Sequence, residues 1–185
     1  MKILGIMHDV TNTTAAIIDN GKVVAGVAEE RLIGLKKHRF FPFKAIQYCL
    51  DEVKCSLSDI DYIAHGFNPA IHSRQYNLRF SNIPRWRAEY FTAIPNSLSS
   101  FYEGEFDEYS YQELKLKTID GKKDLLKIYY IDHHLAHAAN AFFLSPFNEA
   151  AIFTADGRGE HDTGLSGIGQ DQNIRVFNHI EYPHS

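Results

Sequence analysis

Three histidines lie within five positions in the segment DHHLAHAAN, residues 132–140. An apolar run precedes the segment, and Asp132 is a good N-cap for a helix that begins there. On that helix His133 and His137 are four residues apart, so their side chains share one face, with Cβ atoms about 5–6 Å apart. At this spacing two imidazoles can bind one metal ion. His134 points elsewhere, and we expect it not to be a ligand.

A carboxylate at the end of the next predicted strand can supply a third ligand. Asp156 ends the run AAIFTAD, residues 150–156. Two histidines and one carboxylate suit iron(II), zinc or manganese, and the pattern does not choose among these ions. The alternative is that the histidines are ordinary polar residues near a helix start, hydrogen-bonded to the backbone, and it stays open.

The glycine-rich stretch DGRGEHDTG, residues 156–164, is a second candidate site. Glycines permit positive φ and a close approach of the backbone, so the N–H groups of such a turn can surround a phosphate. The alternative is a plain hairpin turn. The candidate nucleotide- or phosphate-binding residues are Gly157, Arg158, Gly159, Glu160, Thr163 and Gly164.

Two further polar segments lie near the N-terminus. His8 and Asp9 directly follow the first predicted strand, where a polar turn can face a ligand. The run LysLysHisArg at 36–39 places cationic groups in a loop that can meet phosphate or carboxylate. The alternatives are a polar loop and a solvated charge run.

The elements that must position these residues follow from periodicity and turn signals. Strands are predicted at 2–7, 13–19 and 22–30, with a hairpin at Asn20-Gly21, and later at 62–67, 125–131, 150–156, 165–170 and 173–182. Helices are predicted at 43–54, after Pro42, and from Asp132 to Leu144. Residues 31–41 read as a basic loop, and 68–118 as two or three helices.

The order of three strands, helix, strand, helices, strand and helix is that of a ribonuclease-H-like α/β lobe. The strand–turn–strand pattern then begins again after Pro146. We therefore expect a first lobe at 1–147 and the beginning of a second at 148–185, as in the actin-like and sugar-kinase-like ATPase superfamily, where glycine-rich turns grip a nucleotide between lobes. Three strands without covering helices bury little, so we expect the sequence to be part of a longer protein.

Composition narrows the class of protein. The chain has 185 residues and a formal net charge of −4, which gives no reason to expect a nucleic-acid or anionic-membrane partner. It contains no apolar run near the roughly 20 residues that a membrane span needs. Two cysteines, Cys49 and Cys55, do not suggest a disulfide framework, so a reducing cytoplasm is expected.

Several motifs together resemble one family, the O-carbamoyltransferases of nodulation-factor and antibiotic tailoring. They are HisAsp at 8–9, AEERL, KKH, HHLAHAANAFFLSPF, TADGRGE, TGLSGIG and the terminal YPHS. The resemblance runs along nearly the whole chain, and HHLAHA with DGRGE is its specific part. It implies an N-terminal module similar to the universal tRNA threonylcarbamoyl-transferase domain, and a C-terminal module that makes carbamoyl-adenylate from ATP and carbamoyl phosphate. The carbamoyl group is then transferred to a hydroxyl of a sugar or natural product.

The resemblance also implies roles for individual residues. His133, His137 and Asp156 match the metal ligands, with iron as the implied ion and a further aspartate beyond residue 185. His8 matches a histidine near the carbamoyl group, beside Asp9 in the same motif, and Lys37 the basic residue of the KH motif, for which Lys36 is the alternative. Residues 10–13, ValThrAsnThr, depart from the family's small AlaSer stretch.

Three other functions compete with this interpretation. An actin-like sugar or acid kinase uses Mg²⁺ held by carboxylates and water, and the HxxxH pair argues against it. A metallopeptidase needs a glutamate beside the first histidine, and HisLeuAla stands there instead. A non-catalytic nucleotide-binding module is the third alternative.

Overall fold

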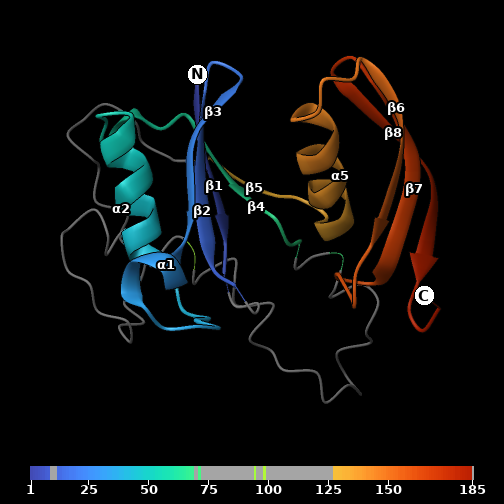
Figure 1. Cartoon of the computed structure of the whole chain (residues 1–185), viewed down its shortest axis with the longest axis horizontal. Helices are drawn as coiled ribbons and strands as arrows, with labels where there is room; N and C mark the ends of the chain where they lie inside the picture. Colours follow the sequence, from blue (N-terminus) through green and yellow to red (C-terminus); the bar gives the residue numbers. More distant parts are fainter. Residues whose placement is uncertain (9–11, 69–70, 72–93, 95–97, 99–126, 185) are drawn as a thin grey trace. The chain divides into compact units, whose positions relative to one another are not determined.

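The computed structural model describes residues 1–8, 12–68, 71, 94, 98 and 127–184 (Figure 1). They fall into two compact units. The first contains the described residues up to 65 together with 94, 98 and 127–129, and the second contains 66–68, 71 and 130–184. The helices expected between 68 and 118 therefore lie almost entirely outside the described residues.

A five-stranded sheet forms the frame of the first unit, with its strands in the order β3-β2-β1-β4-β5. β1 pairs antiparallel with β2 and parallel with β4, and β2 pairs antiparallel with β3. Asn20 and Gly21 have φ of 49° and 80°, as the predicted two-residue hairpin requires. These directions confirm the ribonuclease-H-like sheet. The strands are β1 (Lys2–Met7), β2 (Thr14–Asp19), β3 (Lys22–Ala28), β4 (Tyr62–His65) and β5 (Lys127–Tyr130).

Helices cover one face of this sheet (Figure 1). They are α1 (Glu29–Ile33) and α2 (Phe43–Glu52), and the 3₁₀ turn η1 (Leu57–Asp59) lies between α2 and β4 in the sequence. Ile46 and Cys49 of α2 are fully buried. The prediction of a strand to residue 30 and a loop from 31 was wrong, because Glu29–Ile33 form α1. Glu29 is buried, and its carboxylate accepts the N–H groups of Lys44 and Ala45 at 3.1 and 2.6 Å, so it caps α2.

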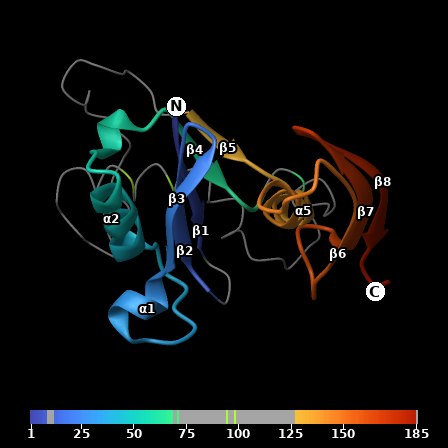
Figure 2. The same cartoon turned by 45° about the horizontal axis from the view of Figure 1, so that its top comes forward.

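The second unit is a three-stranded antiparallel sheet with one helix packed on one face (Figure 2). Its elements are α5 (His133–Phe143), β6 (Glu149–Ala155), β7 (Asp162–Gln170) and β8 (Asn173–Glu181). Ala138 and Phe142 of α5 pack with Ile152 and Leu165 in its core. A Cβ on Gly169 would lie 2.5 Å from the Phe142 ring, so glycine lets the helix approach β7. No helix among the described residues is long and apolar enough to span a membrane.

The two units do not divide at the predicted lobe boundary. Contacts group α5 with the second sheet, so the units separate before this helix, whereas the division of the sequence at 147–148 comes after it. The two units are defined by which residues pack together. The predicted lobe boundary is defined by the point at which the strand pattern begins again. The lobe boundary at 147–148 stays a prediction.

Candidate metal centre

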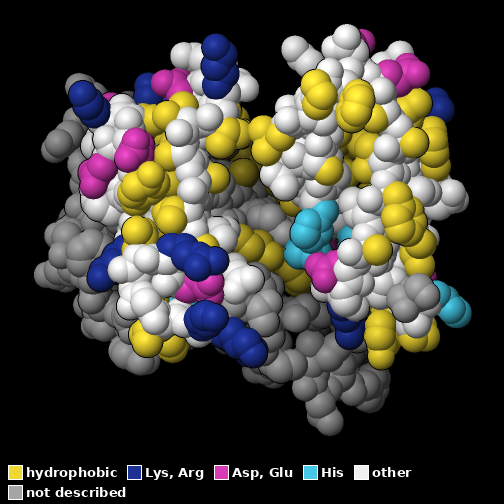
Figure 3. Space-filling view, in the orientation of Figure 1, with side chains coloured by type: hydrophobic (Ala, Val, Ile, Leu, Met, Phe, Trp, Pro, Cys, Tyr) yellow, Lys and Arg dark blue, Asp and Glu magenta, His cyan; other side chains and the backbone are white. Residues whose placement is uncertain are grey.

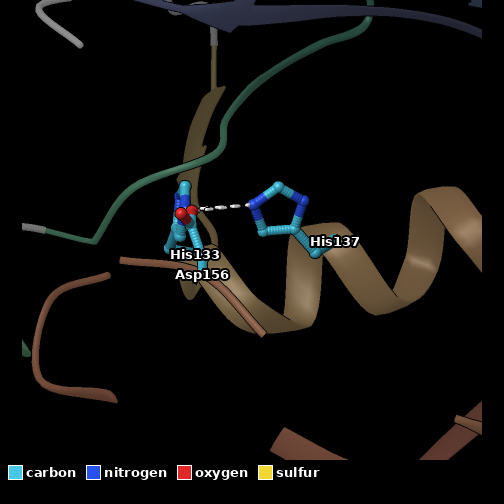
Figure 4. A group of neighbouring side chains, drawn as sticks. All are labelled: His133, His137 and Asp156. Carbon is cyan, nitrogen blue, oxygen red and sulfur yellow. Dashed lines mark hydrogen bonds and ion pairs between the residues drawn. The ribbon is translucent and has the colours of Figure 1, made fainter. Parts of the chain in front are cut away.

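His133, His137 and Asp156 lie together in the second unit, on the elements that the sequence predicts (Figure 4). The histidines occupy successive turns of α5, and Asp156 directly follows β6. Asp156 Oδ2 lies 2.8 Å from His133 Nε2 and 3.4 Å from His137 Nε2, and the two Nε2 atoms are 3.1 Å apart. Within the described part of the chain, these residues form the one group of three or more side chains suited to holding an ion.

The tautomer of His133 explains why these atoms converge. Its Nδ1 lies 3.3 Å from the carbonyl oxygen of Gly66, which only accepts hydrogen bonds, so Nδ1 carries the proton. In the neutral ring Nε2 then has a lone pair directed at the Asp156 carboxylate. Two acceptors at that separation need a cation between them, either a proton or a metal ion.

The separations of the three atoms fit a metal ion. With metal–ligand distances of about 2.1 Å, neighbouring ligand atoms lie about 3.0 Å apart in an octahedron and about 3.4 Å apart in a tetrahedron. The observed separations of 2.8, 3.1 and 3.4 Å lie near that range. The donor set therefore fits a divalent ion without rearrangement of α5 or β6.

Solvent reaches the cluster, as an exchangeable ion requires. The side chains of His137 and Asp156 are 49% and 43% exposed, and that of His133 is 14% exposed. In the space-filling view, histidine and acidic side chains lie side by side at the surface of this unit (Figure 3). Burial tends to raise the pKa of Asp156, but the contacts with the His133 ring, the Gly157 N–H and the His137 ring outweigh it and hold that pKa below its usual value, so the carboxylate is charged.

The helix that carries the histidines is fixed at its beginning. Asp132 is the N-cap, and its Oδ1 accepts the N–H of Leu135 at 2.8 Å, which confirms the predicted cap. His134 is fully buried, with Nδ1 2.9 Å from Thr154 Oγ1 and Nε2 3.0 Å from the carbonyl oxygen of Asp162. Burial lowers the pKa of His134, which favours the neutral ring, and its two hydrogen bonds link α5 to the sheet. Since both its nitrogens are engaged, His134 is placed as a non-ligand, as expected.

The turn formed by the glycine-rich stretch at 156–164 is shorter than predicted. β7 begins at Asp162, so Thr163 and Gly164 lie buried in a strand and not in the turn. The hydroxyl of Thr163 lies against the carbonyl oxygens of Ile180 and His184, and a Cβ on Gly164 would meet the Thr154 carbonyl oxygen at 2.8 Å. The Thr163 hydroxyl is thus engaged within the sheet, and the strands leave no room for a side chain at Gly164.

The remaining turn residues divide into an exposed and a buried pair. Gly157 and Arg158 are exposed, and the Arg158 guanidinium lies 4.7 Å from the ring centroid of Tyr182. Gly159 is buried, and a Cβ there would lie 3.1 Å from His133 Cβ. Glu160 is buried, and its carboxylate accepts backbone N–H groups. Phosphate binding by this turn stays a prediction, for which Gly157 and Arg158 are the accessible residues.

A second histidine cluster lies in the first unit. His8 follows β1, and its Nδ1 is 3.1 Å from Nε2 of His65, the last residue of β4. Both rings are buried. Burial, and next the proximity of His65, lower the pKa of His8 to about 3. Asp9, its predicted catalytic neighbour, lies outside the described residues. His65 was not predicted as a site residue; the only signal was one histidine within the apolar strand predicted at 62–67.

The basic loop is exposed around Lys36 and Lys37. Lys37 has φ of 58°, a left-handed conformation unusual for a side-chain-bearing residue, and its N–H donates to Glu30 Oε2 at 3.3 Å. His38 lies with Nδ1 3.3 Å from the buried Thr13 hydroxyl. The loop is therefore held by backbone and side-chain contacts, while a catalytic role for Lys37 stays a prediction.

Comparison with known proteins identifies the family. The model of the carbamoyltransferase N-terminus matches residues 2–185, so the chain belongs to the carbamoyltransferase N-terminus family. This confirms the resemblance read from the motifs.

Two curated relatives show how much of a longer protein the chain covers. Nodulation protein NolNO of Sinorhizobium fredii is 31% identical over 172 residues, which are 91% of this chain and 22% of the relative. Protein sll1178 of Synechocystis, whose function is uncharacterised, is 34% identical over 193 residues, 99% of this chain and 30% of the relative. The chain thus spans less than a third of either relative.

Among solved structures, YeaZ from Pseudomonas aeruginosa is similar at 14% identity and a TM-score of 0.45, over 96% of this chain and 64% of that one. An Aquifex aeolicus member of the Ppx/GppA family is similar at 14% identity and a TM-score of 0.38, over 100% of this chain and 52% of that one. These scores add nothing to the fold assignment, which rests on strand order and direction.

Proposed function

We propose that this chain is the metal-binding N-terminal part of an enzyme that transfers a carbamoyl group to a hydroxyl acceptor. The observation that carries the proposal is the convergence of His133, His137 and Asp156 on one point, in a chain of the carbamoyltransferase N-terminus family. A kinase of similar fold has no use for two converging imidazoles, since it holds Mg²⁺ through carboxylates, water and phosphates.

The finer form of the proposal names the donor and the acceptor. The donor is carbamoyl-adenylate, made from ATP and carbamoyl phosphate by a C-terminal module beyond residue 185. The acceptor hydroxyl belongs to a sugar or another natural product. Its oxygen bonds to the carbamoyl carbon and loses its proton, while the bond from that carbon to the AMP oxygen breaks and AMP leaves. The motif resemblance supports this form.

The chain's own residues take distinct parts in that reaction. His133, His137 and Asp156 would hold a divalent ion, with iron the ion of first choice and zinc or manganese the alternatives. When bound, such an ion supplies Lewis-acid polarisation of a phosphate or carbamoyl oxygen. Lys37, Gly157 and Arg158 are exposed and are assigned to anionic groups of the donor.

His8 is assigned as a hydrogen-bond donor and not as a general base. With a pKa of about 3 it is neutral at neutral pH and has little affinity for a proton. A neutral imidazole donates one N–H, and we assign the His8 side chain to the carbamoyl oxygen, where negative charge develops.

The test is a transfer assay on the natural full-length protein. Labelled carbamoyl phosphate, ATP and a panel of sugars are incubated with the metal-loaded protein, and AMP and carbamoylated acceptor are measured. Both should appear together, and His137→Ala should abolish the carbamoylated product. The 185-residue chain alone should be inactive. ATP-dependent phosphorylation of a sugar without carbamoyl phosphate would instead support the kinase.

A further inference from the structure

Glu160 is buried beside the first residue of α5. Its side chain is 1% exposed, and both carboxylate oxygens accept the N–H of His133, at 3.2 Å for Oε1 and 3.0 Å for Oε2. The N–H groups of a helix's first turn have no partner within the helix, and a negative charge there is favoured by the helix dipole. Asp132 takes the Leu135 N–H, so the two carboxylates satisfy different groups of the same turn.

The same carboxylate also holds the segment that orients the His133 ring. Glu160 Oε1 accepts the N–H of Asn68, whose side-chain amide donates to the Tyr130 carbonyl oxygen at 3.2 Å. Two residues before Asn68, the Gly66 carbonyl oxygen accepts from His133 Nδ1. Glu160 thus fixes the backbone of His133 directly, and through Asn68 it fixes the strand-end segment that selects the ring's tautomer.

We propose that Glu160 is a positioning residue for the metal centre, aiming His133 Nε2 at the point shared with His137 and Asp156. This inference rests on the metal site of the proposed function. A ligating histidine is generally oriented by a hydrogen bond to its other ring nitrogen, and loss of such outer contacts weakens metal binding about 10–100-fold. Gly159 serves the same arrangement, since a Cβ there would lie 3.1 Å from His133 Cβ and 3.2 Å from His134 Cδ2.

Glu29 provides a matched control, because it is a second buried carboxylate at a helix start and has no part in the proposed metal site. Glu29 is also buried, at 3% exposed, and also caps a helix start through its carboxylate, on the N–H groups of Lys44 and Ala45. Its helix, α2, carries none of the three metal-binding side chains. Loss of a buried capping carboxyl group is therefore common to Glu160→Gln and Glu29→Gln, and loss of ligand orientation is specific to Glu160→Gln.

The experiment is a Co²⁺ titration of the intact protein and of both variants, followed by the visible absorption of bound Co²⁺. In Glu160→Gln the amide NH₂ replaces one acceptor and faces N–H donors, so His133 shifts. The dissociation constant for Co²⁺ should rise about 10–100-fold and the absorption spectrum should change. Glu29→Gln should keep the wild-type constant within about twofold, with an unchanged spectrum.

A second variant covers the case in which Glu160→Gln does not fold. Gly159→Ala keeps the Glu160 carboxylate and crowds His133 by a few tenths of an ångström, so it should also weaken Co²⁺ binding. Equal constants and spectra for wild type, Gly159→Ala and any folded Glu160→Gln would overturn the inference alone. A wild-type protein that binds no Co²⁺ would overturn the metal site and the inference with it.

Discussion

The molecule contains two histidine pairs with the same nitrogen–nitrogen distance and different surroundings. His8 and His65 in the first unit, and His133 and His137 in the second, each bring two ring nitrogens to 3.1 Å. The first pair is buried, and within the described residues no third ligating side chain completes a metal site around it. The second pair is partly exposed and shares the Asp156 carboxylate.

The difference shows that proximity of imidazoles does not by itself make a metal site. At 3.1 Å one nitrogen must donate a proton to the other, or both must face a cation. Burial disfavours added charge, so the first pair keeps a proton between neutral rings. A carboxylate and access to water favour a cation at the second pair. The same residue type is therefore assigned to hydrogen bonding in one unit and to ligation in the other.

The largest effect is expected on the amount of bound metal, which should depend on the exposed histidine pair and not on the buried pair. His137→Ala removes one of the three proposed ligands, so bound metal should fall from about one ion per chain to almost none. His65→Gln, at the buried pair, should leave metal content unchanged. Both are measured by elemental analysis of identically purified full-length protein. Equal ion retention in wild type and His137→Ala would show that the exposed pair is also held only by protons.

The second prediction concerns the packing of α5, the helix that carries the exposed pair, against β7. In Gly169→Ala the new Cβ meets the Phe142 ring at 2.5 Å, so α5 must move away from β7. Overpacking of this degree should cost about 3 kcal/mol in the free energy of unfolding, measured by urea denaturation. Gly157→Ala is the matched control, since nothing lies within 4 Å of its Cβ. If both substitutions prove equally mild, α5 is not tightly packed on the sheet.

The two pairs also differ in how far the sequence predicts them. His133 and His137 are four residues apart on one helix, so local geometry alone places them together, and Asp156 follows because strand ends adjoin that helix. His8 and His65 are 57 residues apart, and their contact depends on the parallel register that pairs Ile6 with His65. This register depends on the pairing of two strands that are distant in the sequence, so no local sequence pattern predicts it.

Glu160 shows a different limit of sequence reasoning. Its glycine-rich surroundings are typical of phosphate-binding turns, and that pattern does not reveal which side chains become buried. Only the tertiary contacts with Asn68 and His133 show that the carboxylate faces inward. The short helix α1 was missed for a related reason, because five residues are too few to display helical periodicity.

The third prediction uses acid to probe the buried pair. The pKa of His8 is about 3 in the folded chain and about 6.5 when unfolded, so only the unfolded state takes up the proton between those values. Stability is therefore fully present above about pH 6.5 and is lost as pH falls towards 3. The loss should reach ~2 kcal/mol between about pH 6.5 and pH 5.

The check is urea denaturation of wild type and His8→Gln across that range of pH. The variant lacks the titrating ring, so its free energy of unfolding should fall less steeply with acid. If the free energy of unfolding falls equally with acid in both proteins, the His8 ring has the same pKa in the folded and unfolded states. Burial would then not distinguish the first histidine pair from the second.

The smallest expected effect concerns the cap of the helix that carries the exposed pair. Asp132→Ala removes the acceptor of the Leu135 N–H and should cost about 1 kcal/mol in the free energy of unfolding. Asp132→Asn keeps a capping oxygen and should stay within a few tenths of a kcal/mol of wild type. Because Glu160 still holds the His133 N–H in both variants, their Co²⁺ affinity should change by less than about threefold, in contrast to Glu160→Gln. Equal destabilisation by Ala and Asn would show that the charge of Asp132 at the helix start matters more than its hydrogen bond.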